Sequence, residues 1–353
     1  MPRDLERQRQ AAEAKRLARQ ARRNQQSTSD VDDAFDGFED SIGLFGDSKV
    51  AHGQAGKLIE YDGLKLHLAN VDGGAVGLMA HFVWNSAFVL AEYIQRDEGS
   101  LVRGKRVLEF GAAAGLDGLL AVKKGAAFVT LSDYPDPKVI SNLERNWCEN
   151  ILGPFLQASL GQPQQQQEPV LEEGFLEKMD HQRRIRSEQG CRSAVRGHAW
   201  GESVTPLLDC IAADRTTDGD VEDGQSTAAS EDRNRYDLIM MADTLWVADG
   251  HRLLLESCKA CLAPKSGSKI IVCCGLHTGL RVVQQFLDMA RSSPFGYTVE
   301  LKEIRQQPRW GETRTEEEQR ADAAKLTEVE LLSFDVEERN RTVLVYELLF
   351  TDK

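Results

Sequence analysis

The 353-residue chain lacks any apolar run close to the ~18 residues that a membrane-spanning helix needs, so we expect a soluble protein with no membrane partner. Cysteine is sparse. The seven cysteines are an odd number, and several lie inside apolar runs, which is typical of free thiols in a reducing, cytoplasmic location. A zinc site could combine Cys258, Cys261, Cys273 and Cys274, but the first two fall on an expected helix and the others in a strand-like run. We therefore predict no metal.

Acidic residues outnumber basic ones outside the N-terminus. The net charge is −13, and residues 1–24 hold eight Lys or Arg against three acids, which leaves −18 on the rest of the chain. Such a body attracts basic protein segments and repels nucleic acid, so we expect a protein partner and no nucleic acid. Residues 1–40 are predicted to form a basic and then acidic flexible tail. Residues 41–353 are predicted to form one domain, with polar surface inserts near 161–190 and 214–232.

Strand-like apolar runs alternate with helical patterns along this domain. The runs lie at 107–110, 128–131, 194–200, 236–242, 269–274, 297–301 and 342–350, and the helical patterns at 88–94, 116–122, 137–150, 251–262 and 280–291. This alternation predicts an α/β fold of Rossmann-like type, with a mostly parallel sheet and helices on both faces. The last run is expected to close the sheet as an antiparallel C-terminal edge.

The central stretch runs from Lys105 to Pro135. A strand-like run ends at Gly111, every residue from there to Gly115 is Gly or Ala, and Asp133 ends the next run, 22 residues beyond Gly111. That spacing is typical of an acid that meets the ribose of a bound adenosine compound. A dinucleotide fingerprint has a second glycine where this chain has Ala113, and Glu109 would repel a nearby pyrophosphate. The pattern favours a cationic adenosine ligand, namely S-adenosylmethionine.

These motifs carry a resemblance. Val107–Leu116 and Leu131–Pro135 resemble the first two nucleoside-binding motifs of the seven-strand methyltransferases, and within them the protein lysine methyltransferase group. The chain is most similar to the fungal nicotinamide N-methyltransferase-like proteins, which methylate the N-terminus and an adjacent lysine of translation elongation factor 1-alpha. The resemblance extends from roughly Phe82 to Leu262. It implies a seven-strand methyltransferase sheet and elongation factor 1-alpha as the protein substrate.

The expected cofactor residues follow from the motifs. We expect the backbone of Gly111, Ala112 and Ala113 to contact the methionyl part of S-adenosylmethionine, and Glu109 to favour its positive charge. Asp133 is expected to bind the ribose, with a helix N-cap as its alternative role. The remaining cofactor candidates are Trp84, which the resemblance places against the cofactor, Trp200, which follows a strand and can stack on adenine, and the small Ala242 beneath the ligand.

The expected catalytic residues are Asp243 and Trp246. The resemblance implies an acid, two residues and then an aromatic here, although Tyr or Phe is more usual than Trp. Asp243 would align the amine, and Trp246 would offer a cation–π face. The chain is thus predicted to be a monomeric S-adenosylmethionine-dependent N-methyltransferase of a protein α-amino group, a lysine, or both. The alternatives are a small-molecule amine methyltransferase, a dehydrogenase, or an inactive scaffold that acts through its basic tail.

Overall fold

The structure is a computed structural model that describes residues 51–70, 79–153, 192–215, 234–306, 326 and 328–350. The predicted tail over 1–40 and the insert near 161–190 lie outside the described residues, as does most of the insert near 214–232. Within these ranges, every helix is too short or too polar to cross a bilayer.

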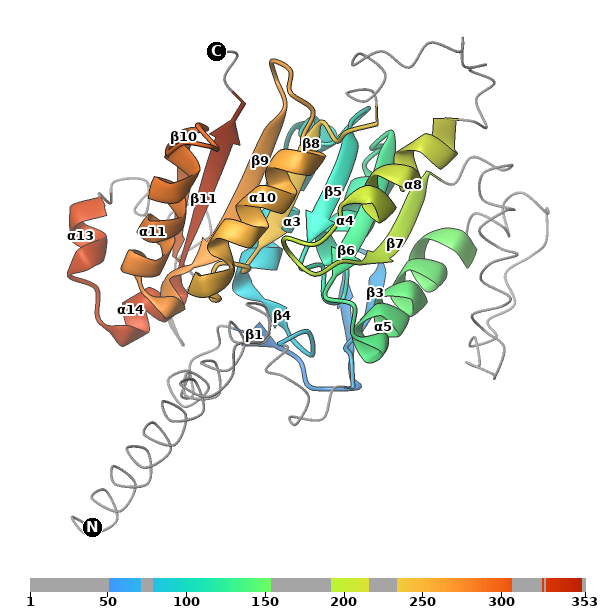
Figure 1. The fold of residues 1–353 in the computed structure, drawn as a ribbon. Helices are drawn as coiled ribbons and strands as arrows, with labels where there is room; N and C mark the ends of the chain where they lie inside the picture. Colours follow the sequence, from blue (N-terminus) through green and yellow to red (C-terminus); the bar gives the residue numbers. More distant parts are fainter. Residues whose placement is uncertain are drawn as a thin grey trace, which may run out of the picture.

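A seven-stranded sheet forms the centre of the protein, in the order β10-β11-β9-β8-β5-β6-β7 (Figure 1). Its strands are β5 (Arg106–Phe110), β6 (Phe128–Asp133), β7 (Ser193–Gly197), β8 (Leu238–Ala242), β9 (Lys269–Gly275), β10 (Thr298–Gln306) and β11 (Thr342–Leu349). The strands β5 to β9 are parallel, whereas β11 pairs antiparallel with both β9 and β10. The predicted fold class is confirmed. Its antiparallel C-terminal end has β10 outermost, because β10 pairs with the outer side of β11.

Helices cover both faces of the sheet (Figure 1). One face carries α8 (Thr205–Arg215), α10 (His251–Cys261) and α11 (Leu280–Arg291), and the other carries α3 (Asn85–Gln95), α4 (Leu116–Lys123) and α5 (Pro137–Trp147). Alternating strand residues supply the two cores: Ile239 and Met241 face the first group of helices, and Leu238 and Met240 face the second. Two further helices, α13 (Glu328–Leu332) and α14 (Val336–Arg341), precede β11.

A small N-terminal hairpin packs against the second face. It consists of β2 (Leu58–Tyr61) and β3 (Leu64–His67), while β1 (Ala51–His52) pairs with β4 (Val83–Trp84). Asparagines four residues apart along α5 and its extension hydrogen bond to the backbone of β3: Asn142, Asn146 and Asn150. A period of four places them on one helix face, where they satisfy the free edge of the hairpin.

The order of the strands creates a crevice. The chain passes from β5 to β6 and β7 on one side, and then returns to place β8 on the other side of β5. Ligands of open α/β sheets bind at such a reversal, beyond the carboxyl ends of the strands. The predicted residues Gly111, Asp133 and Asp243 all lie at these ends.

Candidate functional site

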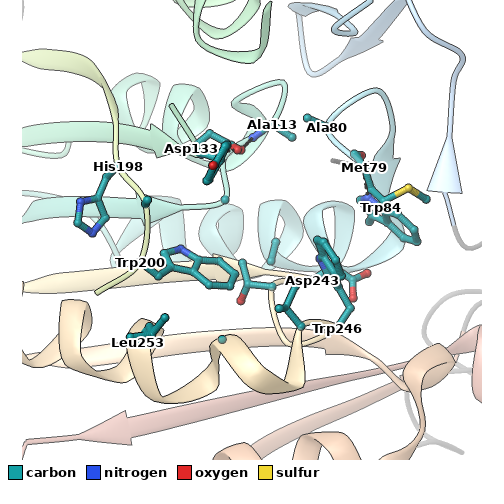
Figure 2. Close-up of a pocket in the computed structure, with 17 residues that line it drawn as sticks. Met79, Ala80, Trp84, Ala113, Asp133, His198, Trp200, Asp243, Trp246 and Leu253 are labelled. Atoms are coloured by element: carbon teal, nitrogen blue, oxygen red, sulfur yellow. Dashed lines mark hydrogen bonds between the residues drawn. The ribbon is translucent and has the colours of Figure 1, made fainter. Parts of the chain in front are cut away.

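A pocket of about 840 Å³, its open mouth included, lies at this crevice (Figure 2). Residues from the ends of β5, β6, β7 and β8 line it, together with the segment that leads into α3. Eight residues predicted from the sequence are among them: Trp84, Gly111, Ala113, Asp133, Trp200, Ala242, Asp243 and Trp246. The structure therefore brings together positions up to 162 residues apart in the chain.

The turn after β5 is closed by the carboxylate at the end of β6. The Ala113 amide donates to Asp133 Oδ2 at 2.7 Å, and Asp133 Oδ1 accepts from the Tyr134 amide at 2.7 Å. Gly111 and Ala113 both have positive φ, at 67° and 48°. That conformation is easy for glycine and unfavourable for alanine. The turn therefore costs some stability at Ala113, and it directs the Ala113 amide toward Asp133.

Asp133 combines burial with access to the pocket. Only 9% of the residue is exposed, and burial raises the pKa of its carboxyl to about 6 despite the two amide donors. Its predicted alternative role is wrong, because the N-cap of α5 is Asp136, whose side chain accepts from the amides of Lys138 and Val139. Each Asp133 oxygen keeps a second lone pair, so the carboxylate can still accept hydrogen bonds from a ligand.

Glu109 and Ala112 do not line the pocket, and their expected roles toward the cofactor stay predictions. Glu109 faces α4, where its Oε2 accepts from the Gly118 amide at 2.9 Å. The methyl group of Ala112 packs into the core on the same side of the sheet. Burial raises the pKa of Glu109 to about 8, and burial together with Glu109 raises the pKa of Asp117 well above its ordinary value. Two carboxyls thus lie beneath the turn rather than beside a ligand.

One end of the pocket is a flat apolar slot. Trp200, Leu253 and His198 lie together there in Figure 2, away from Asp243. A Cβ on Gly250 would lie 3.2 Å from Trp200 Cε3, so glycine lets the helix start approach the indole closely. His198 bonds to Ser257 Oγ at 3.0 Å, and burial lowers its pKa, which keeps the imidazole neutral. An aromatic platform with apolar neighbours suits an adenine ring.

The other end of the pocket carries Trp84, Asp243 and Trp246 (Figure 2). Asp243 is 7% exposed and adopts a positive φ of 53° directly after β8. Its Oδ2 accepts from Ser86 Oγ at 3.0 Å. Asp243 does not cap the next α-helix, because α10 begins at His251, eight residues later, with Gly250 as its N-cap. Asp243 is therefore a buried pocket carboxylate at the same end of the pocket as Trp84 and Trp246.

Sequence reasoning missed several lining residues. Thr244 is the most informative, because its buried Oγ1 has no hydrogen-bond partner among the described residues. A Cβ on Gly111 would lie 2.8 Å from the Thr244 methyl group, so the turn and this threonine enclose a cradle. Met79, His198 and Leu253 were also missed. His198 could have been predicted, since it comes two residues before Trp200 at the end of a strand. Leu253 lies on a helix, and the sequence does not reveal which face of that helix meets the pocket.

The pocket fits S-adenosylmethionine on these observations. The aromatic slot suits adenine, Asp133 can accept from ribose hydroxyls, and the cradle at Gly111 leaves an unpaired Thr244 hydroxyl for the ligand. Within the described parts of the chain, no group of three or more His, Cys, Asp or Glu side chains is placed to hold a metal ion. Fold and pocket together define an S-adenosylmethionine-dependent methyltransferase.

Comparison with known proteins shows what the chain is similar to. Residues 61–153 match the family model described as lysine methyltransferase, which confirms the resemblance read from the motifs. The protein N-terminal and lysine N-methyltransferase efm7 of Schizosaccharomyces pombe is 26% identical over 234 residues, which cover 66% of this chain and 71% of that protein. Its counterpart in Neurospora crassa is 28% identical over 66% of each chain. EFM7 of Debaryomyces hansenii is 27% identical over 56% of this chain and 58% of its own length.

The similarity to solved structures is more distant. A putative S-adenosylmethionine-dependent methyltransferase from Streptococcus mutans has a TM-score of 0.42 and 10% identity, over 84% of this chain and 56% of that chain. The assignment therefore depends on the family match, the curated relatives and the geometry of the pocket. The alignments cover between 58% and 71% of the three curated relatives.

Proposed function

We propose that this enzyme transfers methyl groups to amines of a protein, at an N-terminal α-amino group, a nearby lysine, or both. The observation that carries the proposal is the buried Asp243 carboxylate, which shares one end of the pocket with Trp84 and Trp246, opposite the adenine slot. A carboxylate near indole rings suits an amine acceptor, which is cationic before it loses its proton and again after methyl transfer. Translation elongation factor 1-alpha is the proposed target, because the chain resembles proteins that act on that factor.

The chemistry asks mainly for placement. When bound, S-adenosylmethionine supplies an electrophilic methyl group, and the protein must hold the acceptor nitrogen in line with it. Orientation of this kind can contribute up to ~7 to 11 kcal/mol in favourable cases. The acceptor must lose a proton first, which an α-amino group with a pKa of about 8 does more readily than a lysine at about 10.4. Asp243 can hold the amine before and after transfer without acting as a strong base.

The turn also counts against a dinucleotide. A pyrophosphate needs free backbone amides at the start of the helix. Here the amides of Ala112 and Ala113 donate to Ser132 O and Asp133 Oδ2, and the Gly118 amide donates to Glu109. Those acceptors compete with an anion for the amides of the turn, which disfavours the dehydrogenase alternative.

A direct assay tests the proposed function. Purified full-length protein is incubated with labelled S-adenosylmethionine and elongation factor 1-alpha, either with a free N-terminus or with an acetylated one, and the sites are read by mass spectrometry. Labelling that the acetyl group abolishes identifies the α-amino group, and labelling that survives it identifies lysine. Asp243→Asn should reduce both. Transfer to nicotinamide or another small amine, with no labelled protein, would refute the proposal in favour of the small-molecule alternative.

The remaining properties are predictions from the sequence alone. A monomeric state and a cytoplasmic location are both proposals. The six described cysteines are free thiols, which supports a reducing location.

A further inference from the structure

The carboxylate of Asp243 is held from two sides by groups outside the pocket lining. Ser86, which is fully buried in the first turn of α3, donates from Oγ to Oδ2 at 3.0 Å. The Gly275 amide at the end of β9 donates to Oδ1 at 3.3 Å. Two donors on a buried carboxylate fix the plane of its oxygens.

His277 approaches the same carboxylate from a third direction. Its side chain is 3% exposed, and its Nε2 lies 3.5 Å from Asp243 Oδ1. The imidazole is stacked on Trp84, with ring centroids 5.2 Å apart and an interplanar angle of 21°. On the backbone side, a Cβ on Gly275 would come within 2.5 Å of His277 Nδ1. The ring therefore occupies a slot between an indole and a glycine backbone, which fixes its orientation.

We infer that Ser86 and His277 are positioning residues for the acceptor amine, because they set the direction in which Asp243 presents its negative charge beside Trp84. This inference rests on the proposed amine methylation. Both side chains lie behind the pocket wall, so neither needs to touch the substrate. The 3.5 Å contact is long for a hydrogen bond, and contacts of this kind shorten when a ligand completes the site.

The arrangement gives a role to Ser86, Gly275 and His277, none of which lines the pocket. The helix α3 must begin beside β8 to bring Ser86 to Asp243, and β9 must end in glycine to admit the imidazole. Replacement of Ser86 would leave S-adenosylmethionine binding intact, since Asp133 and Trp200, the residues expected to hold the adenosine, lie elsewhere in the pocket. Only the acceptor amine would lose its alignment. A defect limited to the acceptor therefore distinguishes a positioning role from a general loss of stability.

Steady-state kinetics of the full-length protein test the inference. Ser86→Ala should raise KM for the acceptor protein about 10- to 100-fold, as expected for the loss of a hydrogen bond to a charged group, with KM for S-adenosylmethionine unchanged. Ser193→Ala is the matched control, because it removes another buried hydroxyl, which accepts from Trp147 Nε1 at 2.9 Å far from Asp243. The control should lower stability and leave both KM values unchanged.

Two substitutions separate the polar role of His277 from its packing. His277→Gln keeps an N–H that can reach Asp243, and should retain near wild-type KM for the acceptor. His277→Phe keeps a ring to stack on Trp84 but no donor, and should behave like Ser86→Ala. Equal defects in both variants, or wild-type kinetics in both, would overturn the inference. The proposed function would still stand if the wild-type protein methylates the acceptor protein. A wild-type protein that binds S-adenosylhomocysteine but methylates no amine would refute both together.

Discussion

Asn146→Ala should weaken both the fold and cofactor binding, because this side chain connects the N-terminal hairpin to the cofactor turn. The residue is fully buried. Its Nδ2 donates to His67 O at 2.8 Å and to Ala114 O at 2.9 Å, and its Oδ1 accepts from the His67 amide at 2.8 Å. At about 0.5 to 1.5 kcal/mol for each hydrogen bond, the loss of three predicts roughly 2 to 4 kcal/mol of destabilisation.

The matched control is Asn150→Ala, one turn further along the same helix face. Asn150 bonds to the amide and carbonyl of Lys65, at 2.8 and 2.7 Å, and its Nδ2 also donates to Asn146 O at 2.7 Å, but none of these bonds reaches the cofactor turn. It is partly exposed, so its replacement should cost less, about 1 kcal/mol. Urea denaturation measures the stabilities, and calorimetric titration with S-adenosylhomocysteine measures the affinities. We expect weaker binding for Asn146→Ala alone. Unchanged affinity in that variant would refute the connection between the hairpin and the turn.

Three further predictions concern the cofactor end. Burial raises the pKa of Asp133 to about 6, and ribose hydroxyls bind the ionised carboxylate better than the protonated one. The affinity for S-adenosylhomocysteine should therefore fall as the pH drops below about 6. In titrations at several pH values, Asp133→Asn should bind more weakly and with no such pH dependence. The raised pKa of Glu109 favours its protonated form in the folded state, so that stabilisation is present below the ordinary pKa of about 4.3 and is lost as pH rises through about 8. Glu109→Gln should therefore melt at a higher temperature than wild type above pH 8, and an equal or lower melting temperature would contradict this sign. Trp200→Ala should lose about 1 to 3 kcal/mol of binding free energy in the same titration, as for other bases stacked on aromatics, and full affinity would exclude the adenine slot.

Local patterns predicted the centre of the fold well. The segment from β5 to β6 is continuous in sequence, so a strand-like run, a small-residue turn and an acid at the right spacing were enough to place Gly111 and Asp133 in one pocket. Trp200 and Asp243 could also be placed, because the carboxyl ends of parallel strands meet at one edge of a sheet.

Features that depend on long-range pairing or side-chain direction could not be predicted. The position of β11 inside β10 is a choice of strand partner, which alternation alone does not specify. Glu109 has the right type and spacing for a ligand contact, but its direction across β5 sends it beneath α4 to Gly118. The contact between Ser86 and Asp243 joins residues 157 positions apart, and no pattern in either segment signals it.

The central claim is that the turn closed by Asp133 binds a sulfur-containing adenosine compound. The most direct test is calorimetric titration of the purified chain with S-adenosylhomocysteine and, separately, with a nicotinamide dinucleotide, for the wild type and for Asp133→Ala. We predict that the wild type binds S-adenosylhomocysteine only, and that Asp133→Ala loses about 1 to 3 kcal/mol of that binding free energy. Binding of the dinucleotide without binding of S-adenosylhomocysteine would contradict the account.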